Sequence, residues 1–203
     1  MIRIVESFFV KSAVEPKDYP ASAYTEFAFA GRSNVGKSSL INLLTNKHLL
    51  AKISRTPGKT RVLNFFLIRW KNDDSGQQGF MQFTDFPGYG FAEVSQAEQE
   101  KWRIMIDKYL NMRQQLKGIF VLVDIRHPAD PKDKTMLEML SKRNIDFCVI
   151  ATKADKIPKT KIKAALSQLA KQLDLRDKTI IATSAEKNIG IDSMLAWLEE
   201  RLS

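Results

Sequence analysis

The sequence predicts an α/β domain in which a mostly parallel six-stranded sheet, with one antiparallel strand, carries helices on both faces. Two observations lead to this class. In the second half of the chain, short apolar runs alternate with segments of helical period, which is typical of a parallel sheet covered on both sides. In the first half, the turn 72–76 is too short for a helical crossover and predicts a hairpin. Residues 23–203 are therefore expected to form one domain, with 1–22 as an arm of that same domain.

The elements of the first half follow from apolar patterning and turn residues. Residues 1–22 carry the apolar patch Phe8-Phe9-Val10 ahead of two prolines, which predicts an irregular arm or a short strand. After the arm, apolar runs rich in aromatic residues predict strands, and an amphipathic run predicts a helix. The expected strands are 24–30, 61–70 and 80–84, and the expected helix is 37–45.

The second half alternates helix and strand. Over 95–116, Trp102, Met105, Tyr109 and Leu110 fall on one helical face together with Ile106, as an amphipathic helix requires. Continuous apolar runs such as that at 118–123 predict strands buried on both faces. By the same reasoning, the later strands are 145–151 and 179–183, and the later helices are 131–143, 159–173 and 190–202.

Composition limits the class of protein. The chain has 203 residues, 44% hydrophobic and 27% charged, which is ordinary for a soluble globular domain. Its longest apolar runs are too short to span a bilayer, and Glu6 interrupts the segment where a signal peptide would be apolar. Cys148 is the single cysteine, so no internal disulfide can form, and we expect a cytoplasmic protein. The net charge of +9 favours polyanionic partners, nucleic acid before an acidic membrane.

The segment Gly31–Ser38 reads G-x-x-x-x-G-K-S and lies between an expected strand and an expected helix, which is the context of a phosphate-binding loop. Its glycines let backbone N–H groups converge on a phosphate at a helix N-terminus. Lys37 would reach the β- and γ-phosphates, and the Ser38 hydroxyl would ligate Mg²⁺. The residues expected to bind the nucleotide here are Gly31, Arg32, Ser33, Asn34, Val35, Gly36, Lys37, Ser38 and Ser39.

Three further motifs follow expected strands, at the edge where open α/β sheets bind ligands. In Asp85-Phe86-Pro87-Gly88, Asp85 would hold Mg²⁺ through water and the Gly88 N–H would contact the γ-phosphate. In Thr152-Lys153-Ala154-Asp155, Asp155 can accept two hydrogen bonds from guanine, for which adenine has no matching donor pair; the Lys153 stem would lie along the base. In Thr183-Ser184-Ala185, a backbone N–H would meet guanine O6. Taken alone, each motif is also consistent with an ordinary turn at the end of a strand, and for Asp85–Gly88 the turn is the favoured reading.

Taken in this order, the motifs resemble the translation-factor-like class of P-loop GTPases, and within it the EngB (YihA/YsxC) family of ribosome-assembly GTPases. The segments 55–60 (Arg-Thr-Pro-Gly-Lys-Thr) and 88–90 (Gly-Tyr-Gly) are the most specific to that family. The resemblance implies a GTPase fold, GTP or GDP with Mg²⁺, switches over 46–60 and 86–98, and a large ribosomal subunit or its precursor as partner. The sequence is silent on oligomeric state, and a monomer is the default expectation. The resemblance also assigns Gly58, Lys59 and Thr60 to nucleotide binding, Thr60 to Mg²⁺, and Lys37, Thr60 and Gly88 to catalysis.

Two positions bear on the rate of hydrolysis. Asn34 matches an asparagine that coordinates K⁺ in some relatives, although a variable loop position that happens to carry Asn explains it equally well. Tyr89 stands where Ras-like proteins place the glutamine that orients the attacking water. We therefore expect slow intrinsic hydrolysis, quickened by K⁺ or by a docked partner.

Two basic segments suit rRNA phosphates. Lys47, Lys52, Arg55, Lys59 and Arg61 fall in 47–61, and four lysines fall in 156–163, with no acidic residue in either segment. Two alternatives stay open at this point. One is a signalling switch that recruits a protein effector, for example in cell division. The other is an ATP-using P-loop enzyme, which Asp155 disfavours.

Overall fold

A computed structural model gives the structure of the chain and describes residues 1–47, 50–51, 62–90, 95–175 and 178–202. The strands are β1 (Ile2–Ala13), β2 (Glu26–Gly31), β3 (Leu63–Asn72), β4 (Gln78–Asp85), β5 (Leu116–Asp124), β6 (Phe147–Thr152) and β7 (Ile180–Ala182). The helices are α1 (Lys37–Leu44), α2 (Gln96–Met112), α3 (Pro131–Lys142), α4 (Lys159–Gln172) and α5 (Ile191–Glu199), with short 3₁₀ turns at Pro16–Asp18 and Ala154–Lys156.

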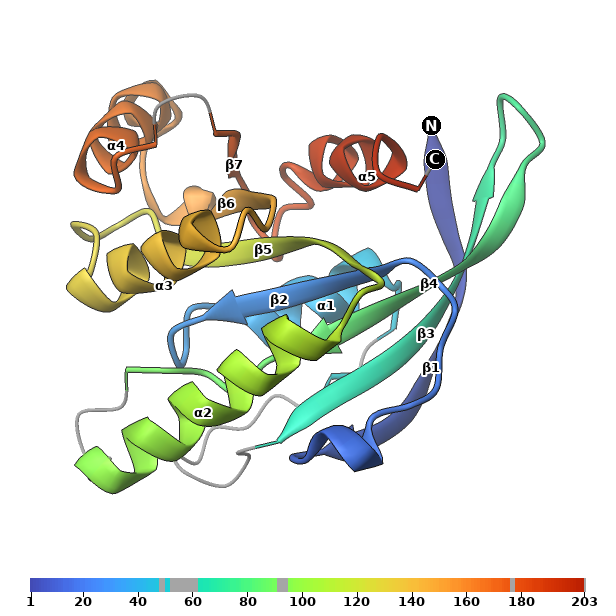
Figure 1. The fold of residues 1–203 in the computed structure, drawn as a ribbon. Coiled ribbons are helices and arrows are strands. Elements are labelled where there is room, and N and C mark those ends of the chain that lie inside the picture. The colour runs from blue at the N-terminus through green and yellow to red at the C-terminus, as the bar shows by residue number, and fades with distance from the viewer. Residues whose placement is uncertain (48–49, 52–61, 91–94, 176–177, 203) are drawn as a thin grey trace.

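Within the described residues, one sheet runs in the order β1-β3-β4-β2-β5-β6-β7 (Figure 1). Strand β3 is antiparallel to both of its neighbours, and the other pairs are parallel. The predicted α/β class with one antiparallel strand is confirmed. The sheet begins β1-β3-β4-β2 because the hairpin of β3 and β4 places β4 beside β2 and leaves β3 to pair with the N-terminal segment.

The predicted number of six strands is wrong, because the described sheet has seven. The additional strand is β1, which occupies much of the segment expected to be an arm and pairs with β3 from Ile2↔Asn72 to Ala13↔Leu63. Two register shifts, between Ile4 and Glu6 and between Phe9 and Lys11, interrupt this pairing. Each bulge moves the following side chains to the other face. The apolar residues of β1 therefore do not alternate, and the pattern of a long strand is hidden in the sequence.

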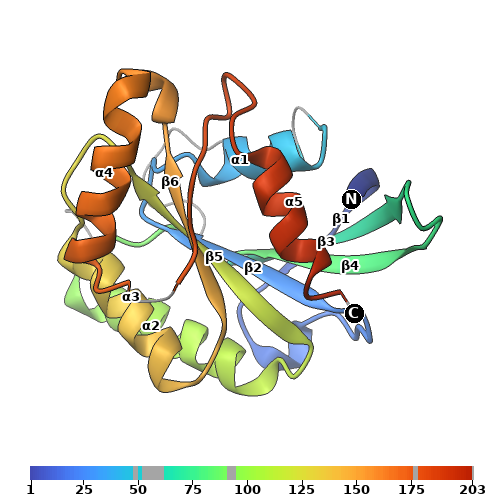
Figure 2. The same ribbon diagram turned by 90° about the horizontal axis from the view of Figure 1, so that it is seen from above.

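The helices form two layers around the sheet (Figures 1 and 2). Helices α2, α3 and α4 pack on one face, where their apolar residues join Ala28, Val121 and Val149 of the central strands. Helices α1 and α5 pack on the other face, against Phe29 and Phe120. Both faces of β2, β5 and β6 are thus covered, which explains why these strands are almost continuously apolar.

Helix α2 ends earlier than the sequence predicts, at Met112 instead of residue 116. Arg113 leaves the helical conformation and turns toward Glu26, the first residue of β2, whose side chain is fully buried. The Glu26 carboxylate accepts hydrogen bonds from Arg113, from the Tyr109 hydroxyl, from Thr84 Oγ1 (2.6 Å) and from Gln82 Nε2 (2.8 Å). This buried network holds α2 on the sheet. In the chain, α2 is the first helix after β4 and the motif that begins at Asp85.

None of the helices in the described residues combines the length and the apolar character that a membrane crossing demands.

Candidate nucleotide-binding site

The phosphate-binding loop joins the end of β2 to the start of α1. Gly36 is the N-cap of α1 and has φ 106°, a left-handed conformation that glycine adopts without strain. Val35 N–H donates to Arg32 O (3.3 Å), which closes the turn. A Cβ on Gly31 would lie 2.9 Å from Val35 Cγ1, so the close fit of the loop requires glycine there as well. The loop thus leads directly into a helix N-terminus, where backbone N–H groups favour an anion.

Lys37 and Asp85 face each other beneath this loop. Lys37 is the first residue of α1 and Asp85 the last residue of β4, and the Lys37 ammonium contacts Asp85 Oδ1 in a pair that is largely buried. Parallel pairing places Asp85 beside Phe29 of β2, two residues before the loop begins. A cation suited to phosphate oxygens and a carboxylate suited to Mg²⁺ therefore meet at the same point.

The segment after Asp85 lies directly against the phosphate-binding loop. Ser33 N–H donates to Tyr89 O (2.9 Å), and Tyr89 N–H donates to Gly31 O (3.3 Å). A Cβ on Gly88 would lie 3.0 Å from Ser33 Cα, so the backbone at Gly88 packs on the loop itself. The Gly88 position is thereby set next to the loop that would hold the phosphates.

The motif at the end of β6 is tied to the same loop. Thr152 Oγ1 donates to Val35 O (2.7 Å), and Lys153 Nζ donates to Asn34 O (2.9 Å) and to Asp124 Oδ2 (2.8 Å). Lys153 adopts φ 61°, which turns the chain away from the sheet after β6. The residues expected to hold the base are thus braced against those expected to hold the phosphates.

Asp155 is oriented by the last motif. Ser184 Oγ donates to Asp155 Oδ1 (2.6 Å), and Lys156 Nζ lies 3.1 Å from the other carboxylate oxygen. The hydrogen bond from Ser184, helped by Lys156, lowers the pKa of Asp155. The carboxylate is therefore ionised at neutral pH, as an acceptor for guanine N1–H and N2–H₂ must be.

The structure brings together every candidate that it describes in the phosphate-binding loop, after β4, after β6 and after β7. Gly58, Lys59 and Thr60 lie outside the described residues, as does most of the expected first switch. Asn34 is exposed, and its backbone carbonyl, instead of its side chain, makes the contact with Lys153. Arg32 extends away to α3, where its guanidinium lies 3.0 Å from Asp130.

Sequence reasoning missed three carboxylates near these loops: Asp124, Asp130 and Asp133. Asp124 is held ionised by Arg126 and Lys153, whose hydrogen bonds outweigh its burial and lower its pKa. Like Asp85, it ends an apolar strand at the carboxyl edge, so the same rule would have found it. Asp130 and Asp133 belong to the first turn of α3 and carry no comparable sequence pattern.

The donor set suits Mg²⁺. The Ser38 hydroxyl at the start of α1 and the buried Asp85 carboxylate are oxygen ligands, which Mg²⁺ prefers. Among the described side chains, no group of three or more His, Cys, Asp or Glu is close enough to hold a metal ion without other ligands.

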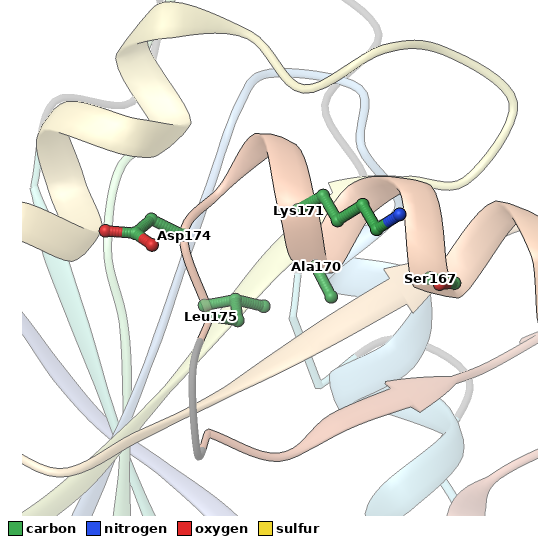
Figure 3. A pocket seen from close by; sticks show the side chains of 5 residues that line it. All are labelled: Ser167, Ala170, Lys171, Asp174 and Leu175. Atoms are coloured by element: carbon green, nitrogen blue, oxygen red, sulfur yellow. The ribbon is translucent and has the colours of Figure 1, made fainter.

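A shallow hollow lies elsewhere, at the C-terminal end of α4 (Figure 3). Its lining consists of Ser167, Ala170, Lys171, Asp174 and Leu175. None of these residues takes part in the described contacts around the phosphate-binding loop. One lysine and one aspartate at the open rim do not form a recognisable binding or catalytic site.

Comparison with known proteins identifies the family. A family model described as 50S ribosome-binding GTPase matches residues 26–153. A probable GTP-binding protein EngB of Ligilactobacillus salivarius (strain UCC118) is 47% identical over 93% of this chain and 92% of its own length. The chain belongs to the EngB family. A second EngB, from Myxococcus xanthus (strain DK1622), is 41% identical over 96% of this chain and 93% of its own.

Solved structures agree with the EngB assignment. The crystal structure of a probable GTP-binding protein EngB has a TM-score of 0.63 at 25% identity and covers 87% of this chain and 98% of its own. Era in complex with MgGDPNP and a fragment of 16S ribosomal RNA has a TM-score of 0.68 at 23% identity, over 89% of this chain and 57% of Era, and shares the fold. As a member of the EngB family, the protein binds GTP and hydrolyses it.

Proposed function

We propose that this protein is a GTP-timed assembly factor for the large ribosomal subunit, which binds a maturing particle in the GTP state and leaves after hydrolysis. The observation that carries the nucleotide part is the Asp155–Ser184 pair, braced through Lys153 against the phosphate-binding loop. The family description, 50S ribosome-binding GTPase, supports the ribosomal part. The positive net charge of +9 suits a particle made largely of RNA.

The geometry supports distinct roles at the phosphates. Lys37 moves from Asp85 onto the β- and γ-phosphate oxygens, because a phosphate is a stronger partner for its ammonium than one carboxylate. Asp85 would then be free to hold Mg²⁺ through water, with the Ser38 hydroxyl as a further ligand; Thr60, the ligand that the family resemblance implies, lies outside the described residues. The Mg²⁺ ion, when bound, neutralises charge on the β- and γ-phosphates. Gly88 N–H, next to Ser33, is the proposed contact for the γ-phosphate.

Hydrolysis is proposed to be slow without help. The Tyr89 hydroxyl donates to Asp133 on α3 (2.9 Å) and the side chain is buried, so it is not placed to orient a water. We propose that K⁺ held at Asn34, or a docked partner, supplies the missing stabilisation. Turnover measured in K⁺ and in Na⁺ tests this: equal rates in both would remove the K⁺ proposal.

Guanine recognition is tested by Asp155→Asn. An amide at this position keeps one acceptor for N1–H but presents a donor to the exocyclic group at C2, so affinity should move from guanine, which carries a donor there, toward xanthine nucleotides, which carry an acceptor. Asp192→Asn, on the exposed face of α5, is the matched control and should leave specificity unchanged. Unaltered guanine preference in Asp155→Asn would contradict the assignment of the base site.

The ribosomal role is tested by co-sedimentation with purified subunits, with a non-hydrolysable GTP analogue or with GDP. Retention on large subunits with the analogue alone, weakened by salt, is expected. No retention in either state would overturn the ribosomal part and leave the GTPase intact.

We propose that helix α4 contacts the RNA of the ribosomal particle. Lys159, Lys161 and Lys163 are exposed and make no ion pair within the described residues. Changing all three to glutamine should weaken retention and its salt dependence, without changing nucleotide affinity. A triple exchange of the exposed Lys11, Lys101 and Lys142 is the control of equal charge. Equal losses in the two triple variants would remove α4 from the interface.

A further inference from the structure

Tyr89 is enclosed between two helices that follow it in the chain. It is 8% exposed, its hydroxyl donates to Asp133 Oδ1 of α3 (2.9 Å), and its ring packs edge-on against Trp102 of α2 with centroids 5.4 Å apart. Trp102 Nε1 in turn donates to Pro87 O (2.9 Å). The segment on both sides of Gly88 is therefore held from the outside by side-chain contacts, in addition to its backbone bonds to the phosphate-binding loop.

The first turn of α3 makes two connections to the nucleotide loops. Asp130, the N-cap of α3, accepts from Lys132 N–H (2.9 Å) and lies 3.0 Å from the guanidinium of Arg32 in the phosphate-binding loop. Asp133, in the first turn of the helix, accepts from the Tyr89 hydroxyl. Both acidic side chains of this turn thus reach across to residues that flank the phosphate position.

We propose that Tyr89 and Asp133 are positioning residues for GTP, which hold Gly88 against the phosphate-binding loop before the γ-phosphate arrives. The inference rests on the proposed function, in which Gly88 N–H contacts the γ-phosphate. A segment that is already ordered loses less conformational freedom on binding, and this raises affinity without any new contact to the ligand.

Selectivity between GTP and GDP follows from this role. GDP has no γ-phosphate, so its affinity does not depend on the placement of Gly88. Removal of the hydrogen bond from the Tyr89 hydroxyl to the charged Asp133 carboxylate is expected to lower the affinity for a GTP analogue by about threefold to tenfold. The affinity for GDP should change by less than about twofold.

The test measures both affinities by fluorescence titration in the full-length protein. Tyr89→Phe removes only the hydroxyl, Asp133→Ala removes the acceptor, and Asp133→Asn retains an acceptor oxygen. The two disrupting variants should lower the ratio of GTP to GDP affinity equally, and the double variant Tyr89→Phe/Asp133→Ala should lower it no further, because both changes break the same bond. Asp133→Asn should restore most of the ratio.

Controls separate positioning from loss of folding. Tyr24→Phe removes the hydroxyl of an exposed tyrosine at the opposite end of β2, and Glu138→Gln neutralises an exposed acid on α3; both should leave the ratio unchanged. An unchanged or increased ratio in Tyr89→Phe, with a normal melting temperature, would overturn the inference. Equal losses of GTP and GDP affinity in that variant would also overturn it, because they indicate a general loss of structure.

Gly88→Ala distinguishes this failure from failure of the proposed site. The added methyl would lie 3.0 Å from Ser33 Cα and displace Gly88 from the loop. Loss of GTP preference in Gly88→Ala but not in Tyr89→Phe would keep the γ-phosphate contact and remove the role of Tyr89. Full GTP preference in Gly88→Ala would overturn both.

Discussion

The buried network around Glu26 gives the sharpest stability prediction. Replacing Arg113 with alanine leaves the Glu26 carboxylate, which is completely buried, without its cationic partner. It also removes the hydrogen bond from Arg113 to Pro20 O (3.2 Å), which ties the segment after β1 to the end of α2. Loss of one partner from a buried ion pair costs about 3–5 kcal/mol. This is a large part of the roughly 5–15 kcal/mol that stabilises an ordinary domain.

The expected result is a fall in melting temperature of about 6–20 °C, from roughly 2–4 °C per kcal/mol for a domain of this size. Urea unfolding at pH 7, followed by circular dichroism, measures the free energy directly. Arg103→Ala is the matched control, because Arg103 lies on the exposed side of the same helix and, among the described residues, forms an ion pair with Glu100 alone; the unfolding midpoint of this variant should not move.

A double variant tests the cause. Glu26→Gln with Arg113→Met removes both charges and keeps acceptors for Thr84 and Tyr109. It should recover more than half of the lost stability, because no isolated charge is then buried. The reasoning is refuted if Arg113→Ala unfolds within about 1 kcal/mol of the original protein, or if the double variant is no more stable than the single one.

Three further predictions concern the stability and reactivity of buried groups. Burial raises the pKa of Asp133 to about 6 from its ordinary 3.8, so the folded state binds this proton more tightly and should gain about 1 kcal/mol between pH 7 and pH 5; Asp133→Asn should show that much less pH dependence in urea midpoints. Burial also raises the pKa of the Cys148 thiol to about 12, and this thiol should react with a disulfide reagent at pH 8 only after denaturation. Gly118→Ala places a methyl group against the ring of Trp197 and should lower the free energy of unfolding by about 1–3 kcal/mol. An unchanged unfolding transition in calorimetry would contradict this prediction.

The sequence alone predicted those parts of the site that depend on residues close together in the chain. The phosphate-binding loop, Asp85 and the motif that ends in Asp155 each follow an apolar strand directly, and parallel strands bring their carboxyl ends to one edge. Their approach in space therefore follows from the order of strands and helices alone. The alternation itself fixed the fold class, because buried parallel strands have few other solutions.

The parts that were not predicted depend on partners distant in the chain. Strand β1 was not predicted as part of the sheet because two bulges shift its side chains between faces. Its pairing partner, β3, also lies far from it in the chain. Glu26 reads as the polar start of an apolar strand, and only the fold brings Arg113 to it. The contact between Tyr89 and Asp133 depends on how α3 packs across the loops, which no spacing in the sequence encodes.

The position of β1 has a consequence for how the chain is made. Strand β1 lies at the edge of the described sheet, and it precedes in the chain its pairing partner β3, which ends at Asn72. During translation, β1 therefore has no pairing partner until residues 63–72 have emerged, and Phe8, Phe9 and Val10 remain exposed even in the folded structure. The bulges that hide this strand in the sequence also make it a poor template for the backbone of another chain. The bulges therefore limit pairing with other chains both before β3 is made and after the sheet is complete.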